Sequence, residues 1–452
     1  MRKPLVTTQP LSTTSLITKY DVPVPRYTSF PTAVQFKPTA SQSDFTKQLS
    51  ALTPNQAISI YIHIPFCHSL CHYCGCHTKI VHTYSPIGKY IGTLLQEIRQ
   101  AATVIGKPIP VSQIHFGGGS PNYAKTEDIA KILQALEQNF LTSPDTQIAM
   151  ECDPRLLDEQ KINDYTQLGI SRISLGIQDF NHRVQKAINR IQPFQQVQKQ
   201  IQLMRKAGIT AINFDLITGL PEQSLDTVEQ TLEQVLKLQP SRIAVFPYAH
   251  VPWMKKHQKL LERFGLPTTD ERFAMNLLVQ SVLTNAGYSP IGIDHYAQKT
   301  DSLYQTQKTG NLRRNFQGYT GDTNQTVLGC GLSSISQFKN AYFQNTTDAS
   351  AYTAAINVQT FPLSRSLHLT ADDKIRGKLI ERLMCYFEIN FNDYKSIAIP
   401  HKELLALEKD GLVSISGNRL SITEQGKPFV RIVAACFDPY LKKEKRRHAK
   451  AI

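Results

Sequence analysis

The stretch Ile58-Ser-Ile-Tyr-Ile-His-Ile64 is followed directly by Pro65-Phe66 and then by Cys67-His-Ser-Leu-Cys71-His-Tyr-Cys74-Gly-Cys76. Its first seven residues alternate in the manner of a β-strand, and the proline ends that pattern. The four cysteines are therefore expected on a loop that follows the C-terminal end of a first strand. Parallel α/β folds build their active sites at this end of the strands.

Outward from this strand, β-rich runs alternate with helical patterns as far as about residue 250. The predicted strands are Ile58–Ile64, Val111–Phe116, Gln147–Cys152, Arg172–Ile177, Ala211–Ile217 and Arg242–Phe246. The predicted helices are Tyr90–Ala101, Thr126–Phe140, Asp158–Leu168, Phe194–Ala207 and Leu225–Leu238. Such alternation predicts a parallel sheet with right-handed crossovers. Six units favour an α/β fold with an incomplete, open barrel, and a doubly wound sheet is the alternative.

The rest of the chain differs in texture. Turn-forming residues dominate from about 255 to 360, where we expect closing strands and long loops. Helices are predicted over Ala371–Tyr386 and Glu403–Lys409, a hairpin that turns at Gly417-Asn418 follows, and a last helix is expected from about Glu424. This order is typical of a smaller, mostly helical, winged-helix-like domain. The predicted division is an N-terminal extension over 1–54, a catalytic barrel over 55–360 and a C-terminal domain over 361–452.

Composition bounds the function. The 452 residues include 50 Lys and Arg against 36 Asp and Glu, a formal charge of +14. This surplus fits an anionic partner, whether nucleic acid, acidic lipid or a small polycarboxylate. Part of it lies in the run Lys442–Arg447, which is interpreted as a solvated tail. No stretch is long and apolar enough to span a bilayer, and no secretory signal is seen, so a cytoplasmic protein is expected.

The spacing CxxxCxxC places three thiols close together on one loop. Three thiolates can hold three irons of a cubane cluster and leave the fourth iron open for a substrate. A zinc site that mixes cysteine and histidine is an alternative, because four histidines lie among the thiols, but structural zinc sites usually take two separated pairs. A disulfide is a weaker alternative. The remaining cysteines, Cys152, Cys330, Cys385 and Cys436, show no framework spacing and are expected in the core.

Polar residues follow each predicted strand. The second strand runs into Gly117-Gly-Gly-Ser-Pro121, and Glu151, Gln178, Asp215 and the sequence Tyr248-Ala249-His250 lie in or after later strands. Each could be a turn or capping residue on its own. Together they predict one ligand-lined mouth at the C-terminal ends of the strands, because surface capping does not require a polar residue at every strand end.

The cysteine spacing resembles that of the radical S-adenosylmethionine (SAM) enzymes, and the glycine run resembles the segment that cradles the methionyl end of SAM in them. Along nearly its whole length the chain resembles the oxygen-independent coproporphyrinogen III oxidases. The motifs that carry this resemblance are Tyr20-Asp21, Pro25-Arg-Tyr-Thr-Ser-Phe-Pro31, Tyr61-Ile-His-Ile-Pro-Phe-Cys67, Cys74-Gly-Cys76, Glu151-Cys-Asp-Pro-Arg155, Gly176-Ile-Gln-Asp-Phe180, Asn189-Arg190 and Asn315-Phe-Gln-Gly-Tyr319.

The resemblance implies a [4Fe–4S] cluster and two SAM molecules side by side in each chain. The implied cluster ligands are Cys67, Cys71 and Cys74, while Cys76 is a hallmark of the family but no ligand. The SAM on the cluster would be lined by Tyr61, Gly118, Glu151 and Ile335. The second SAM would be lined by Tyr73, Gly119, Ser120, Gln178, Arg190, Asp215 and Ala249. Tyr61 and Cys76 are the catalytic candidates. Ser120 stands where the family usually has threonine, and Gly321-Asp322 interrupts a threonine-rich loop.

The implied reaction starts with a radical derived from SAM. That radical takes a hydrogen from the β-carbon of a propionate of coproporphyrinogen III. Loss of CO2 and one electron then leaves a vinyl group, and a second round gives protoporphyrinogen IX in heme biosynthesis. The expected partners are this substrate, an unidentified electron donor and an unidentified terminal acceptor, with no nucleic acid and a monomeric chain. Tyr20-Asp21 and Arg26–Ser29 are expected to form a lid over the mouth.

Two other functions compete with this reaction. One is a related radical SAM protein that binds heme or modifies another substrate, and Cys74-Gly-Cys76 together with the entry segment argues against it. The other is a metal-stabilised nucleic-acid-binding protein that uses the C-terminal domain. That function would assign no role to the first ~360 residues. Winged-helix folds also serve many functions, so the fold alone does not indicate nucleic-acid binding.

Overall fold

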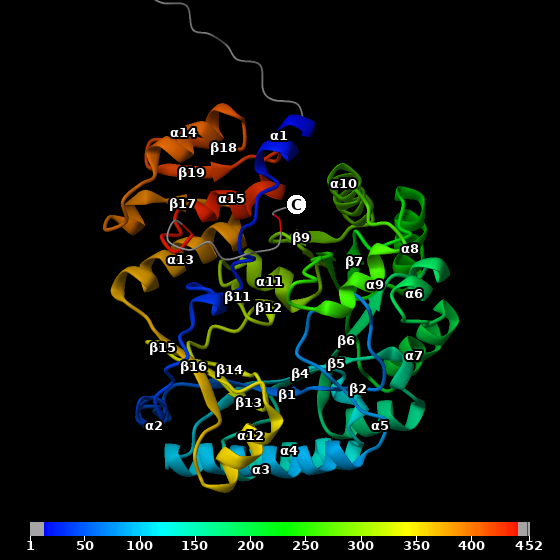
Figure 1. Ribbon diagram of the computed structural model, residues 1–452, viewed down its shortest axis with the longest axis vertical. Coiled ribbons are helices and arrows are strands. Elements are labelled where there is room, and N and C mark those ends of the chain that lie inside the picture. The colour runs from blue at the N-terminus through cyan, green and yellow to red at the C-terminus, as the bar shows by residue number, and fades with distance from the viewer. Residues whose placement is uncertain (1–12, 442–449, 451–452) are drawn as a thin grey trace, which may run out of the picture.

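The computed structural model describes residues 13–441 and residue 450. The basic run Lys442–Arg447 lies outside the described residues. A sheet of twelve strands forms the centre of the molecule, with helices on its outer face (Figure 1). Its parallel strands are β1 (Ile58–Ile64), β4 (Val111–Gly118), β5 (Gln147–Cys152), β6 (Ile170–Gln178), β7 (Ala211–Thr218), β8 (Arg242–Pro247) and β13 (Val327–Cys330). The six predicted strands are thus confirmed, in the predicted parallel arrangement.

Antiparallel strands extend both edges of this parallel core. On the β13 side they are β14 (Ile335–Gln337), β15 (Ala341–Asn345) and β16 (Leu363–His368), and beyond β8 they are β10 (His295–Ala297) and β9 (Ser289–Ile291). The order across the sheet is β16-β15-β14-β13-β1-β4-β5-β6-β7-β8-β10-β9. Because the two edge strands do not pair with each other, the barrel stays open, as the six predicted units indicated.

Helices cover the outside of the barrel. They are α2 (Gln42–Ser50), α3 (Ser85–Ile105), α4 (Thr126–Asn139), α5 (Glu159–Gln167), α6 (His182–Ala187), α7 (Phe194–Lys206), α8 (Leu225–Leu238), α10 (Thr269–Asn285) and α12 (Ala349–Asn357). The apolar side chains of β1 lie in one continuous core with those of α3, as Ile60, Ile62, Leu94 and Ile98 illustrate. Burial on both faces is usual for parallel strands between helices. The polar residues at the C-terminal ends of the strands therefore face the mouth of the barrel.

Shorter elements connect these parts. They are η1 (Ala33–Gln35), β2 (Phe66–Cys67), β3 (Lys79–Ile80), η2 (Pro121–Tyr123), η3 (Pro154–Leu156), η4 (Lys256–Gln258), α9 (Lys259–Glu262), α11 (Ser302–Lys308), β11 (Arg313–Asn315) and β12 (Gly318–Thr320). The expectation of closing strands after residue 255 is confirmed by β9 to β15. The 17-residue helix α10 was not predicted there, although Thr268 and Glu271 form a capping box at its start.

The C-terminal part contains α13 (Ala371–Tyr386), β17 (Glu388–Asn390), η5 (Phe391–Tyr394), α14 (His401–Lys409), β18 (Val413–Ser416), β19 (Arg419–Ile422), η6 (Lys427–Phe429) and α15 (Val430–Ala435). The hairpin turns at Gly417-Asn418 as predicted. The last helix begins at Val430 instead of near Glu424, because residues 427–429, with Pro428 among them, form a 3-10 turn first.

The N-terminal segment packs between the barrel and the C-terminal part. Helix α1 (Thr13–Tyr20) lies beside α15 in Figure 1, and Leu16, Tyr20, Tyr27 and Phe30 belong to the C-terminal apolar core. The division into 1–54, 55–360 and 361–452 stays a prediction. Residues before Pro31 nevertheless contribute buried apolar side chains to the core of the third of these parts.

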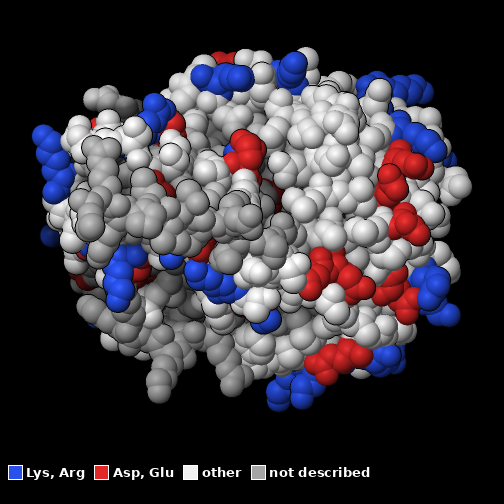
Figure 2. Space-filling view, turned by 90° about the horizontal axis from the view of Figure 1, so that it is seen from above, with Lys and Arg blue, Asp and Glu red and all other residues white. Residues whose placement is uncertain are grey.

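No helix among the described residues is long and apolar enough to cross a membrane. The described basic residues behind the formal charge of +14 do not form a cluster on the face of the molecule that includes the C-terminal part (Figure 2). Among the described residues, Figure 2 shows Lys and Arg side chains standing apart there, with Asp and Glu between them. This face therefore presents no continuous basic patch in its described part.

Candidate active site

The cysteine loop leaves the end of β1 and is held at both ends by backbone hydrogen bonds. Strands β2 and β3 pair in parallel, and the amide of Val81 donates to the carbonyl oxygen of Cys67 at 3.1 Å. In the middle of the loop, the amide of His72 donates to the carbonyl of Ile188 at 3.0 Å, and the side-chain amide of Asn189 donates to Leu70 at 2.9 Å. The loop is thus fixed against the region just after α6.

All four cysteines of the loop are free thiols that line one cavity of about 230 Å³. Among the described residues, no three His, Cys, Asp or Glu side chains converge on a point that could hold a single metal ion. This arrangement does not fit the mononuclear zinc site considered above. A cubane cluster binds each thiolate to a different iron, so its ligands surround a volume rather than a point.

Donor groups surround the sulfur atoms. Arg190 Nη1 lies 3.5 Å from Cys71 Sγ, and Ser120 Oγ lies 3.6 Å from Cys67 Sγ. A hydrogen bond from the Cys76 thiol lowers the pKa of the Cys74 thiol to about 6, whereas burial raises the pKa of the Cys67 thiol to about 12. Metal coordination deprotonates a thiol outright, and hydrogen bonds to sulfur tune the potential of a cluster. The loop therefore fits an iron–sulfur cluster.

The glycine run at the end of β4 lies directly against the start of the cysteine loop. A Cβ atom on Gly119 would lie 2.7 Å from the carbonyl oxygen of Phe66. Gly118 has a φ of +127°, and a Cβ atom there would lie 2.7 Å from the carbonyl oxygen of Ile64. Only glycine permits this approach of two backbones. Such a bare backbone edge fits the predicted cradle for SAM.

A buried ion network lies behind the cysteines. Asp153 Oδ2 is 2.6 Å from Arg155 Nη2 and 3.2 Å from Arg190 Nη1, and the Asp153 and Arg190 side chains are 6% and 7% exposed. Burial alone would raise the pKa of the Asp153 carboxyl, but the charges of Arg190 and Arg155 outweigh it and lower that pKa. The guanidinium of Arg190 also donates to the carbonyl of Gly176 at 2.9 Å. Arg190, which was expected to line the second SAM, is thus held in place by an internal carboxylate.

Asp215 lies on the inner face of β7, close to two polar neighbours. Its carboxylate accepts hydrogen bonds from Ser174 Oγ and Asn213 Nδ2, each at 2.9 Å. Burial raises the pKa of the Asp215 carboxyl to about 6, and the nearby charge of Glu151 adds to the shift. Carboxylates held in this way bind ribose hydroxyls or ammonium groups.

A second cavity of about 550 Å³ lies beside the first one. Tyr61, Glu151 and Ile335 line it, and the Tyr61 hydroxyl lies 3.1 Å from His63 Nδ1. Burial raises the pKa of Tyr61 well above its usual value and lowers the pKa of His63 to about 4. Both rings are therefore neutral near pH 7. Cys76, Gly118 and Glu151 line both cavities, so the two meet at the cysteine loop.

The two cavities divide the predicted site residues. The larger cavity is lined by Tyr61, Cys76, Gly118, Glu151 and Ile335. The smaller cavity is lined by Cys67, Cys71, Tyr73, Cys74, Cys76, Gly118, Gly119, Ser120, Glu151, Gln178, Arg190 and Asp215. Ala249 is in neither set. Sequence reasoning assigned no site role to Asp153, Arg155, Phe316 or Gln317, although the first two stand in the quoted Glu151–Arg155 motif and the last two in the Asn315–Tyr319 motif.

Known proteins resemble this chain closely. The profile of the radical SAM superfamily matches residues 61–235. The oxygen-independent coproporphyrinogen III oxidase of Bradyrhizobium diazoefficiens is 39% identical over 95% of this chain and 97% of its own length. The enzyme of that name from Escherichia coli is 36% identical over 96% of each chain. A solved structure of the Escherichia coli coproporphyrinogen III oxidase, described as a radical SAM enzyme, gives a TM-score of 0.87 at 35% identity, over 92% of this chain and 97% of that one.

The open barrel and its cysteine loop therefore define a radical SAM protein, a class whose cofactors are a [4Fe–4S] cluster and SAM. Within that class, the extent of identity along the whole chain shows that it belongs to the family of oxygen-independent coproporphyrinogen III oxidases. The resemblance stated from the sequence, the fold class and the class of enzyme are confirmed.

Proposed function

We propose that this chain converts coproporphyrinogen III to protoporphyrinogen IX without oxygen, by oxidative decarboxylation of two propionates to vinyl groups. The observation that carries the proposal is the pair of cavities that meet at one cysteine loop, within a chain that matches the named enzymes from end to end.

Bound at this site, a cluster and SAM would supply a 5′-deoxyadenosyl radical after one-electron reduction. Cys67, Cys71 and Cys74 would hold the cluster. Cys76 would stay free between the two cavities, where a catalytic role for it is proposed. The neutral phenol of Tyr61 can donate a hydrogen bond into the larger cavity, because burial and Glu151 keep its pKa well above neutral pH.

We further propose that each chain binds two SAM molecules, one in each cavity. The division of lining residues described above supports this, since the residues implied for the first SAM all line the larger cavity. Those implied for the second SAM line the smaller one, except Ala249. Equilibrium binding of SAM to the reconstituted protein should approach two per chain, and saturation at one per chain would remove this part of the proposal.

A basic hollow next to the larger cavity suits the carboxylates of the substrate. It has a volume of about 390 Å³ and is lined by Arg313, Lys339, Lys374 and Lys378 against the acids Asp373 and Glu381. Gln337 lines both this hollow and the larger cavity, and the β11–β12 hairpin contributes residues to each. A substrate with four carboxylates can place one propionate at the reacting centre and direct others toward these cations.

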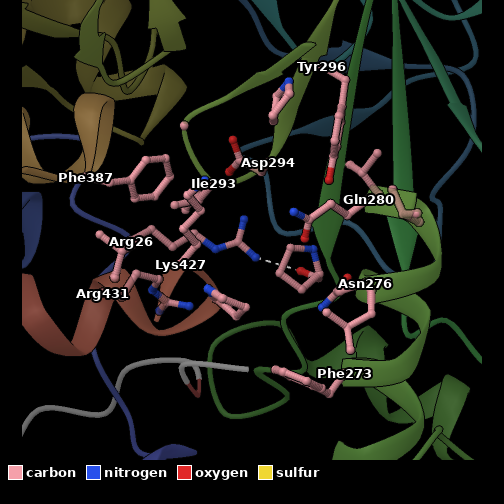
Figure 3. Close-up of a pocket in the computed structure, with 18 of the residues that line it drawn as sticks. Arg26, Phe273, Asn276, Gln280, Ile293, Asp294, Tyr296, Phe387, Lys427 and Arg431 are labelled. Carbon is pink, nitrogen blue, oxygen red and sulfur yellow. Dashed lines mark hydrogen bonds between the residues drawn. The ribbon is translucent and has the colours of Figure 1, made fainter. Parts of the chain in front are cut away.

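The N-terminal segment fits the proposed role of a lid. Residues 27–30 line the basic hollow. Arg26 extends into a separate cavity of about 250 Å³ between the barrel and the C-terminal part, where its Nη2 donates to the carbonyl of Pro247 at 2.7 Å (Figure 3). Pro247 ends β8, two residues before Ala249, so the segment is tied to the rim of the mouth. Because Tyr20 and Tyr27 lie in the C-terminal core, point substitutions test this role better than truncation.

Isotope transfer tests the proposed reaction. Coproporphyrinogen III labelled with deuterium at the β-carbons of its propionates would be incubated without oxygen with reconstituted enzyme, SAM, a limiting amount of dithionite and a one-electron acceptor. The reaction predicts that deuterium appears in 5′-deoxyadenosine as vinyl groups form. Vinyl groups that form while 5′-deoxyadenosine stays unlabelled would refute hydrogen abstraction at that carbon.

The remaining expectations extend the proposal. We propose a cytoplasmic, monomeric enzyme that takes electrons from a separate donor and passes them to a separate acceptor, and that binds no nucleic acid. Light scattering during size-exclusion chromatography tests the monomer, because a mass near twice the chain's 50.9 kDa would contradict it.

A further inference from the structure

The segment that follows β8 crosses over the cysteine loop and is bonded to it. Three of its side chains donate to backbone carbonyls of the loop: Lys255 Nζ to Cys76 at 2.6 Å, His257 Nε2 to Cys74 at 2.9 Å and Gln258 Nε2 to Tyr73 at 2.8 Å. We call residues 251–263 the covering segment. These bonds hold the segment directly against the loop, so its exposed side chains lie close to the cluster site.

The covering segment carries three large apolar side chains that are exposed to solvent. Trp253 is 46% exposed, Met254 is 68% exposed and Leu260 is 43% exposed. Exposed apolar side chains are usually scattered singly over a protein surface, whereas contiguous ones mark interaction sites. These three lie within eight residues of one another and next to the loop that would hold the redox centre.

The charges around this apolar surface are mainly positive. The covering segment carries Lys255, Lys256, Lys259 and Arg263 against one acid, Glu262, whose carboxylate lies 3.0 Å from His250 Nε2. Helix α6 lies beside α9 in Figure 1. The two pack together through Leu261 of the covering segment, which clusters with Val184 and Ile188. That helix adds Arg183, which pairs with Glu222, and the exposed Lys186.

We propose that this surface docks an acidic electron-transfer protein that carries a flavin or an iron–sulfur centre. The inference rests on the proposed function, in which a cluster on the cysteine loop receives one electron from outside the chain. In that step a flavin hydroquinone loses one electron to become the semiquinone, and the cluster gains that electron. A small apolar centre with a charged rim suits a transient complex, because rim charges set the rate and selectivity of encounter more than its affinity.

Charge reversal tests the proposal. The variant K256E/K259E would be compared with K395E/K402E, a matched pair of exposed lysines in the C-terminal part. The probe is a fully reduced flavodoxin, mixed with the reconstituted holoenzyme, and cluster reduction is followed by stopped-flow absorbance. We expect the second-order rate constant to fall about tenfold in the first variant only, and its dependence on salt to weaken. Equal rates in both variants, or an equal fall in both, would overturn the proposal.

Two further measurements separate the possible failures. Dithionite needs no docking site, so both variants should be reduced by it at the wild-type rate and should form product with it. If the wild type forms no product with dithionite and a one-electron acceptor, the proposed function fails. If it forms product, but the rate of reduction by flavodoxin does not change on charge reversal, only the docking site fails. Trp253 is the one tryptophan of the chain. In wild-type protein labelled with fluorotryptophan, its fluorine NMR signal should shift when flavodoxin is added, and an unchanged signal would contradict docking here.

Discussion

Replacement of Asp153 by asparagine removes the negative charge from the ion network behind the cysteines. The Asp153 and Arg190 side chains are 6% and 7% exposed, so Arg190 would keep a buried positive charge without its carboxylate. Breaking a buried pair from one side costs about 3–5 kcal/mol. Asparagine keeps the shape and one acceptor oxygen, which places the expected loss near the lower end, about 3 kcal/mol. That loss corresponds to about a hundredfold change in the unfolding equilibrium.

Urea titration of the cluster-free protein measures this loss. The matched control is Asp158→Asn, because Asp158 accepts from the amide of Lys161 at the start of α5 and asparagine caps a helix equally well. The control should change the free energy of unfolding by less than about 0.5 kcal/mol. If D153N loses no more stability than D158N, the ion network does not stabilise the site as described.

The stability difference between wild type and D153N should depend on pH in a defined direction. Burial is outweighed by Arg190 and Arg155, so the pKa of the Asp153 carboxyl is lower in the folded protein than in the unfolded chain. A lowered pKa contributes stability above the unfolded value, near 4, and that contribution is lost as the pH falls through the folded value. Wild type and D153N should therefore differ fully at neutral pH and converge in acid. A difference that grows in acid would contradict the charge argument.

Other predictions follow from the site. Cys67→Ser, Cys71→Ser and Cys74→Ser should each lose the visible absorbance of the reconstituted cluster, whereas Cys76→Ser should keep it; equal loss in all four would contradict the ligand set. Because the pKa of Asp215 is about 6, one class of SAM binding should weaken as the pH falls below that value, and calorimetry should find this dependence absent in D215N. K339Q/K378Q should raise KM for coproporphyrinogen III several-fold while SAM cleavage continues, and K402Q should leave KM unchanged as the control. An unchanged KM in K339Q/K378Q would exclude the basic hollow as a binding site for the substrate's carboxylates. Gly119→Ala should weaken SAM binding at least tenfold, since a Cβ atom would lie 2.7 Å from the carbonyl oxygen of Phe66; wild-type affinity would contradict the cradle.

The central strands were predictable because each is an apolar run that ends in a turn or a polar residue. Strand β1 was found with its observed bounds, and the hairpin at Gly417-Asn418 was marked by its turn residues. Helix α10 was missed for a physical reason. Its buried residues serve two cores, since Met275 and Val279 pack in the barrel core and Phe273 in the C-terminal core, so no single apolar stripe marks it.

The candidate site was predictable only in part. The spacing of the cysteines indicated the cluster loop, and the family resemblance supplied the residues that the structure then divides between two cavities. Contacts between distant residues left no local signal. Asp153 accepts from the amide of Arg155, which is a local contact, but its pairing with Arg190 depends on how β5 and β6 lie in the sheet. The contact between Arg26 and Pro247 spans 221 residues and has no local signal either.

Product analysis tests the central claim most directly. The reconstituted enzyme would be incubated without oxygen with SAM, a limiting amount of dithionite, a one-electron acceptor and coproporphyrinogen III. After oxidation, the porphyrins would be separated by chromatography and identified by mass spectrometry. The account predicts protoporphyrin that carries two vinyl groups, with two CO2 released for each molecule, and no such product from Cys71→Ser. A wild-type enzyme that holds its cluster and cleaves SAM, yet leaves all four propionates of the substrate intact, would contradict the account.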